Sequence, residues 1–271
     1  MSDTASDGVT AGRDRVSAIQ PAERRQLHTR LLRCTLAADD CYAYWRNVAP
    51  QVPQALRAGV AFEQRWFGIK SEARVRTLLG DMFERFDAYP EALAFLRKAV
   101  RMPAGLRPLV CHLHVALADP VYRQFVGRFI PDRRTEGRTT IDRPTVARWV
   151  DSLAPDRWSP MTRMKFASNL LATARDVGIV RGARDPRELP PFTAPDFALG
   201  YALYLLRGVR IEGTLADNLY LRSLGVGPDS LARKAARIPG VRVGELGSAV
   251  AVTLLEPDLA AWGLRSLSEA M

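Results

Sequence analysis

The chain has 271 residues, of which 47% are hydrophobic and 25% are charged, a balance that excludes a fibrous or extensively disordered chain. Its net charge of +10 comes mostly from arginine, and the only lysines are Lys70, Lys98, Lys165 and Lys234. The longest apolar stretches, around 109–118 and 197–206, are too short to cross a bilayer, so we expect a soluble protein without a membrane partner.

The cysteines and the first residues point to the cytoplasm. Cys34, Cys41 and Cys111 are odd in number and match no metal spacing, which is typical of reduced thiols in a cytosolic protein. Residues 1–13 carry Asp3 and Asp7 and no apolar core, so they resemble neither a secretion signal nor a transit peptide. We therefore expect a cytoplasmic protein.

Residues 1–20 show no periodicity and predict a flexible tail. From Pro21 the pattern predicts helices, and we assign residues 21–158 to a helical domain. Its first stretch, from Arg24 to Arg33, holds four arginines and no acid beside a leucine face. These arginines either contact phosphate or are simply solvated.

The clearest amphipathic helix lies between Ser71 and Asp87, with Ser71 as its N-cap. Its apolar residues recur with helical spacing at Val75, Leu78, Leu79, Met82, Phe83 and Phe86. Further helices are expected over 90–100 and 106–117, with another after Asp119. Together these elements predict a helix bundle. The composition of residues 131–144 predicts an exposed loop, and a short helix is expected to follow over 145–153.

We assign residues 159–271 to a second domain. It opens with a helix capped by Ser159 and ended by Gly178. The expected inward face is Met164, Ala167, Leu170, Leu171, Ala174 and Val177, and Phe166 fits it poorly. Five bases face one acid across 159–184, a net charge of +4. Such a helix either lies along phosphates or packs with a basic outer face.

Residues 214–255 predict a winged helix. A short helix follows a capping pattern at Thr214 and Asp217, and a glycine turn at 225–227 leads into a second helix opened by Pro228. Leu231, Ala235 and Ile238 are expected to point inward, while Ser230, Arg233 and Arg237 form an outward stripe. Alternating apolar residues at 241–243 and 250–254 then predict a β-hairpin. We therefore expect a mainly α fold: an N-terminal helix bundle, then a C-terminal winged-helix-like region with a small β-hairpin.

Positive charge is concentrated in these two segments. Over 222–242, five bases stand against Asp229 alone, again a net charge of +4, so the two segments hold 8 of the net +10. A genome rich in GC raises the arginine content but does not predict this clustering. Guanidinium groups bind phosphate oxygens and guanine edges, so we expect DNA binding, on condition that the basic segments meet on one face. A winged helix used only for protein contacts remains open. The residues expected to bind DNA from this charge pattern are Arg163, Lys165, Ser230, Arg233, Lys234, Arg237 and Arg242.

Known enzyme and metal motifs are absent from the sequence. Cys111, His112 and His114 are spaced wrongly for one helix face and have no second ligand pair, so we expect partly buried histidines and no metal. There is no phosphate loop, dinucleotide fingerprint or nucleophile elbow. We expect no catalytic residues, no cofactor and no small-molecule substrate.

Two motifs resemble the BrxA family of BREX bacteriophage-defence systems. One is SEARVRTLL at 71–79 followed by MFERF at 82–86, and the other is SPMTRMK at 159–165 followed by LL at 170–171 and VGI at 177–179. The resemblance covers about residues 31–206, and the segment 214–271 is longer than in typical members. It implies a non-enzymatic helical protein that binds double-stranded DNA within a multi-protein defence system. It also adds Arg74 and Arg76 to the expected DNA-binding residues, and places Thr162 and Lys165 in the second motif.

Two other functions remain open: an adaptor that joins defence proteins through its winged helix, and a sequence-specific transcription regulator. An enzyme of unknown type ranks last, and a buried cluster of acids or histidines with shifted pKa values would favour it.

Overall fold

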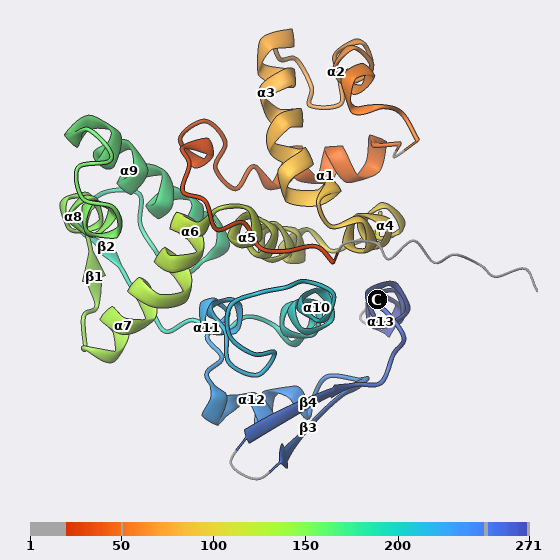
Figure 1. The fold of residues 1–271 in the computed structure, drawn as a ribbon, viewed down its shortest axis with the longest axis vertical. Coiled ribbons are helices and arrows are strands. Elements are labelled where there is room, and N and C mark those ends of the chain that lie inside the picture. Colours follow the sequence, from red (N-terminus) through yellow and green to blue (C-terminus); the bar gives the residue numbers. More distant parts are fainter. Residues whose placement is uncertain (1–19, 50, 247–248, 270–271) are drawn as a thin grey trace, which may run out of the picture.

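The computed structural model describes residues 20–49, 51–246 and 249–269, so the expected tail at 1–20 lies almost wholly outside the described residues. Within the described part, helices dominate and two small antiparallel sheets of two strands each are added (Figure 1). This confirms the predicted mainly α fold with a small β-hairpin.

The first part of the chain is helical, apart from an extended segment before Ala38. Its helices are α1 (Ala38–Asn47), α2 (Gln54–Glu63), α3 (Glu72–Met82), α4 (Pro90–Lys98), α5 (Arg107–Ala118), α6 (Pro120–Gln124), α7 (Ile130–Thr135) and α8 (Arg143–Leu153). The chain continues from α3 through a π-helical turn at Phe83–Asp87, and a second such turn, Phe125–Phe129, joins α6 to α7.

The remaining part adds further helices and both sheets. Its elements are α9 (Pro160–Val177), α10 (Asp196–Arg207), α11 (Leu219–Ser223), α12 (Pro228–Ala235) and α13 (Leu259–Glu269), with strands β1 (Thr140–Ile141), β2 (Arg187–Glu188), β3 (Val241–Leu246) and β4 (Ala249–Leu254). β1 pairs with β2, and β3 pairs with β4 with Val243 opposite Val252. None of the described helices has the length and apolarity needed to cross a membrane.

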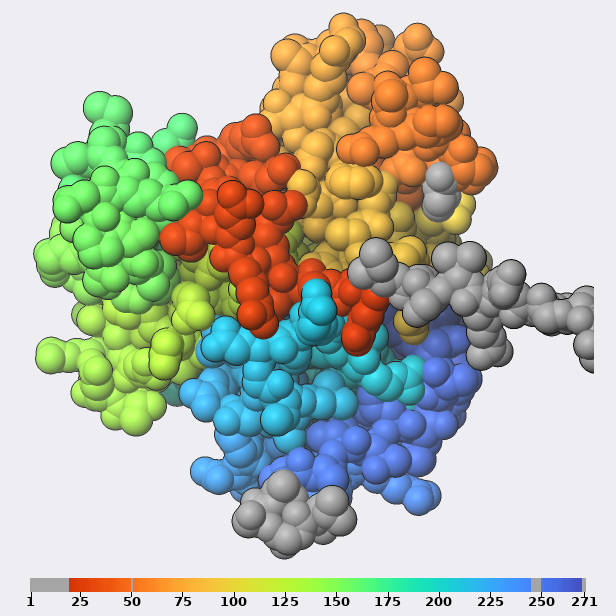
Figure 2. All heavy atoms as spheres, viewed as in Figure 1, coloured from red at the N-terminus to blue at the C-terminus, as the bar shows by residue number. Residues whose placement is uncertain are grey.

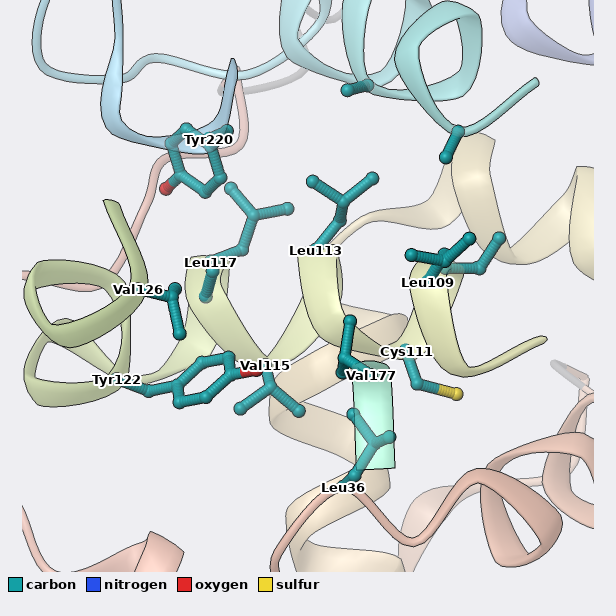
Figure 3. Packing of buried hydrophobic residues seen from close by; sticks show 14 of the residues in the cluster. Leu36, Leu109, Cys111, Leu113, Val115, Leu117, Tyr122, Val126, Val177 and Tyr220 are labelled. Carbon is teal, nitrogen blue, oxygen red and sulfur yellow. The ribbon is translucent and has the colours of Figure 1, made fainter. Parts of the chain in front are cut away.

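Helix α5 forms the centre of the core. Every residue from Leu109 to Ala118 is buried, because neighbouring elements cover the helix on all sides. Figure 3 shows Leu113 and Leu117 on one side of this helix and Val115 and Cys111 on the other, each facing a different neighbour. A helix that is buried on every face must be covered on every face, so the neighbouring helices pack around α5.

The expected helix at Pro21 is wrong. Residues 21–36, which we name the N-terminal strap, are extended except for one 3₁₀ turn at Arg30–Leu32, and they cross the face seen in Figure 2. Backbone hydrogen bonds tie the strap to distant parts of the chain: Glu23 N–H donates to Arg210 O (3.0 Å) and Arg24 N–H to Leu117 O (2.9 Å). Long-range pairing replaces the hydrogen bonds of a local helix.

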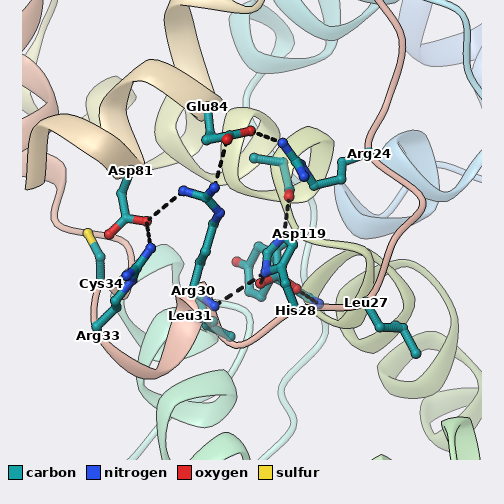
Figure 4. A network of polar contacts seen from close by, with 12 residues as sticks. Arg24, Leu27, His28, Arg30, Leu31, Arg33, Cys34, Asp81, Glu84 and Asp119 are labelled. Carbon is teal, nitrogen blue, oxygen red and sulfur yellow. Dashed lines mark hydrogen bonds and ion pairs between the residues drawn. The ribbon is translucent and has the colours of Figure 1, made fainter. Parts of the chain in front are cut away.

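Three of the four arginines of the strap are paired with acids of α3 and its π-helical extension, and the fourth, Arg25, lies 3.9 Å from Glu23. Arg24 and Arg30 both bind Glu84, and Arg30 and Arg33 lie 3.8 and 3.7 Å from Asp81 (Figure 4). Asp81 is buried, and burial raises the pKa of its carboxyl. This arginine cluster therefore stabilises the position of the strap.

Two other local expectations are corrected. The expected loop at 131–144 begins with α7, because the chain passes from α6 through the π-helical turn without a break and Pro131 fits the first turn of α7. In α9 the expected inward face is buried from Ala167 to Val177, but Met164 is 41% exposed and Phe166 takes its place, fully buried against Trp158. The caps of this helix are confirmed: Ser159 accepts from Thr162 N–H, and Gly178 has the left-handed conformation (φ 87°).

Contacts cross the expected domain boundary at residue 159. α8 packs along α9, and β1 pairs with β2 from the other side of the boundary. One continuous cluster of buried apolar side chains runs from Leu31 to Leu267. The division into two domains therefore stays a prediction, and both regions share one core.

Candidate nucleic-acid interface

Helix α11, the glycine turn, helix α12 and the β3–β4 hairpin follow one another in the predicted order of helix, turn, helix and hairpin (Figure 1). Gly225 has φ 73°, and a Cβ atom there would lie 2.0 Å from Phe192 O, so the turn before α12 requires glycine. α12 starts at Pro228, and its Leu231 and Ala235 are buried as expected. α12 packs against α10 and β3.

The C-terminal end of α12 is held by aromatic residues. Trp262 of α13 stacks on Tyr204 of α10 with ring centroids 5.1 Å apart, and its Nε1–H donates to Pro239 O (2.9 Å). The Tyr204 hydroxyl donates to Gly240 O (2.6 Å). These bonds fix the point where α12 ends and β3 begins, so the helix and the hairpin form a rigid pair.

The outward face of α12 is open to solvent. Its exposed positions follow helical spacing: Asp229, Ala232, Arg233, Ala236 and Arg237. The two alanines are small, so a partner surface can approach the helix backbone closely between the arginines.

Arg233 and Arg242 are the cations of this unit that no described residue engages. Both are exposed, and neither has an ion pair or a side-chain hydrogen bond with any described residue. Arg237 is also exposed but pairs with Asp196 at 2.8 Å, an exposed contact of modest strength.

The other two predicted residues of the unit serve the local structure. Ser230 Oγ accepts from Gly227 N–H (3.2 Å) and so caps α12. Lys234 Nζ donates to Gly225 O (2.7 Å), and its pKa is lowered by burial and by Arg233 and Arg237. Ser230 and Lys234 therefore support the turn, and Arg233, Arg237 and Arg242 supply the outward charge.

The remaining predicted residues lie elsewhere. Arg74 donates to Arg33 O (2.7 Å) and Arg76 pairs with Glu72 (2.6 Å), both on α3. On α9, Arg163 pairs with Asp151 of α8, while Lys165 is exposed without a described partner.

Figure 1 places α3 at the top of the molecule, α9 at the left and α12 at the bottom. The predicted residues therefore come from three helices that lie apart in this view. The candidate surface is then formed by α12 and the β3–β4 hairpin, which pack on α10 and α13.

The buried histidines are part of the core. His112 bonds to the Tyr122 and Ser223 hydroxyls, and His114 bonds to Arg85 O and the Tyr201 hydroxyl. Within residues 20–49, 51–246 and 249–269, no three His, Cys, Asp or Glu side chains are grouped so as to hold a metal ion.

One feature near α12 did not stand out in the sequence. Arg134, Arg138 and Phe192 line a surface pocket of about 390 Å³. The expected loop at 131–144 contains both arginines, and nothing in their sequence context sets them apart from its other charged residues. Neither a scan against protein-family models nor a search of curated protein sequences finds a match to this chain.

Proposed function

We propose that this chain is a non-enzymatic protein that binds double-stranded DNA through α12 and the β3–β4 hairpin. The observation that carries the proposal is the open face of α12, where Ala232 and Ala236 lie beside Arg233 and Arg237, with Arg242 on the adjoining strand. No described protein segment covers this face.

The dimensions and charge of α12 suit a DNA groove. An α-helix with its side chains is about 10–12 Å wide, close to the width of about 12 Å of the major groove. Alanines at the contact face let the helix enter deeply, and flanking guanidinium groups reach phosphate oxygens or guanine edges. Two freely exposed arginines supply few specific base contacts, so we expect binding that depends mainly on charge, with a Kd of about 10⁻⁴–10⁻⁶ M.

The double variant R233Q/R242Q tests this interface. We expect the affinity for a random-sequence duplex to fall roughly tenfold or more, because each lost phosphate contact removes one released counterion. The slope of log Kd against log salt concentration should fall by about 2 between about 50 and about 200 mM salt. Fluorescence anisotropy with a labelled duplex measures both quantities.

The matched control is R97Q/R101Q, which removes two exposed arginines near α4, away from α12 in Figure 1. This control should bind as the wild type does. An R233Q/R242Q protein with an unchanged circular dichroism spectrum and unchanged binding would contradict the proposal. So would a wild-type protein that shifts no DNA at low salt, which would favour the adaptor function.

We further propose that the DNA binding serves defence against bacteriophage. This proposal rests on the resemblance of the motifs at 71–86 and 159–179 to BrxA. In a host strain that carries the complete defence locus, replacing the chain with R233Q/R242Q should raise the efficiency of phage plating toward that of a deletion strain. Plating that stays at the wild-type level would argue that the DNA-binding face is not needed for defence.

A further inference from the structure

The pocket beside α7 is a second candidate binding site, and we propose that it binds a phosphate group. It is lined by the polar residues Arg134, Arg138 and Thr139 and by the apolar residues Leu189, Pro191 and Phe192. Two cations, a hydroxyl and an aromatic ring around about 390 Å³ form a site for an anion with some apolar surface, such as a phosphate attached to a sugar.

Arg134 carries its charge without an anionic partner. Its Nη2–H donates to Ile179 O (2.7 Å), which fixes the guanidinium, but its Nε is buried and bonds to no described atom. It forms no ion pair with any described carboxylate, and burial lowers its pKa. The buried Nε is not within reach of an incoming ligand, but a partly desolvated guanidinium with no carboxylate partner attracts a phosphate oxygen to its remaining N–H groups.

Arg138 and Thr139 complete the polar side of the pocket. Both are exposed, and their side chains have no described partner. The negative end of α7 is close by, but its last carbonyl groups are already bonded: Arg138 N–H donates to Arg133 O, and Gly137 N–H donates to Arg134 O. Glu188, the neighbour of Leu189 in the chain, lies 3.8 Å from Arg181, and the residues that line the pocket include no acid. The pocket therefore keeps a net positive charge.

The apolar wall of the pocket is joined to the turn before α12. Phe192 O lies against Gly225, and Ala194 N–H donates to Leu224 O (3.0 Å). The pocket thus adjoins the glycine turn from which α12 starts. A duplex seated on α12 has phosphates on both sides of the groove, so its backbone is one source for the phosphate, and a free phosphate or nucleotide is the other. The first source rests on the proposed function, whereas the phosphate site itself does not.

The test uses two titrations of the full chain. Inorganic phosphate is added to isotope-labelled protein while the Nε–H signal of Arg134, assigned with R134K, is followed by NMR. In parallel, a random-sequence duplex is titrated against R138Q. We expect phosphate to shift the Arg134 signal, and we expect R138Q to weaken duplex binding about threefold to tenfold and to lower the salt slope by about 1.

R128Q is the matched control, since Arg128 is exposed on the same helical stretch but does not line the pocket. A phosphate-induced shift with wild-type duplex binding by R138Q would support the site and assign free phosphate as its source. An unmoved Arg134 signal together with unchanged duplex binding by R138Q would overturn the proposal. If the wild type binds no duplex, the function proposed for α12 fails, and the phosphate titration decides the pocket separately.

Discussion

Lowering the pH from about 7 to about 4.5 should remove roughly 5 kcal/mol of unfolding free energy, because two histidines are buried in the neutral form. Burial lowers the pKa of His112 to about 3 and that of His114 to about 4. In the unfolded chain both titrate near the ordinary value of 6.5. Below that pH the histidines of the unfolded state bind protons and those of the folded state do not. The free energy of unfolding therefore falls by about 1.4 kcal/mol per histidine and pH unit.

The hydrogen bonds around each ring explain why the neutral form is required. Arg85 O can only accept, so His114 Nδ1–H donates to it (2.7 Å) and Nε2 accepts from the Tyr201 hydroxyl (2.7 Å). The Ser223 hydroxyl donates to Tyr220 O, so it accepts from His112 Nε2–H, and the Tyr122 hydroxyl donates to His112 Nδ1. A second ring proton would leave a buried hydroxyl hydrogen without an acceptor.

Buried carboxyl groups act in the opposite direction. Burial raises the pKa values of Asp81 and Asp119, so both groups favour the folded state as the pH falls through their folded values. Urea unfolding of H112Q/H114Q and of the wild type at several pH values between 7 and 4.5 separates the two effects. The wild type should lose stability more steeply than the variant. Parallel curves for the two proteins would show that other groups control acid unfolding.

The variant R85M should lose about 3–5 kcal/mol of unfolding free energy, because it removes a buried cation that binds the N-terminal strap. Arg85 is 5% exposed and donates to Cys34 O (2.8 Å), Thr35 O (2.7 Å) and Leu36 O (3.0 Å). Methionine fills much of the same volume but donates no hydrogen bond. Three carbonyl groups would then be buried without these partners, next to an Asp81 carboxyl that also loses a nearby positive charge.

Urea denaturation at pH 7, followed by tryptophan fluorescence, measures this loss. The control is R76M, whose arginine is 67% exposed and pairs only with Glu72 one helical turn away. An exposed pair of this kind contributes little, so R76M should stay within about 0.5 kcal/mol of the wild type. Equal losses in the two variants would mean that Arg85 does not hold the strap through its hydrogen bonds.

The sequence alone predicted the helix boundaries that depend on capping and first-turn residues close to them in the chain. Ser71 caps α3, Gly178 ends α9 and Pro228 opens α12 as expected, because capping and first-turn preferences depend on a few neighbouring residues. The hairpin after α12 follows in the same way from alternating apolar residues. Helical periodicity also identified Leu231 and Ala235 as the buried side of α12, and hence Arg233 as part of its outer side.

Only the tertiary structure decided which arginines are free. Arg163 is paired with Asp151 across two helices, Arg237 with Asp196 across 41 residues, and Arg30 with Glu84 across 54. Likewise, the strap at 21–36 is extended because its hydrogen-bond partners lie on α5 and beyond α10. A count of charges along the chain treats every arginine alike. The charge available to a partner depends instead on which acids the fold places within ion-pair distance of each arginine, and those acids are distant in sequence.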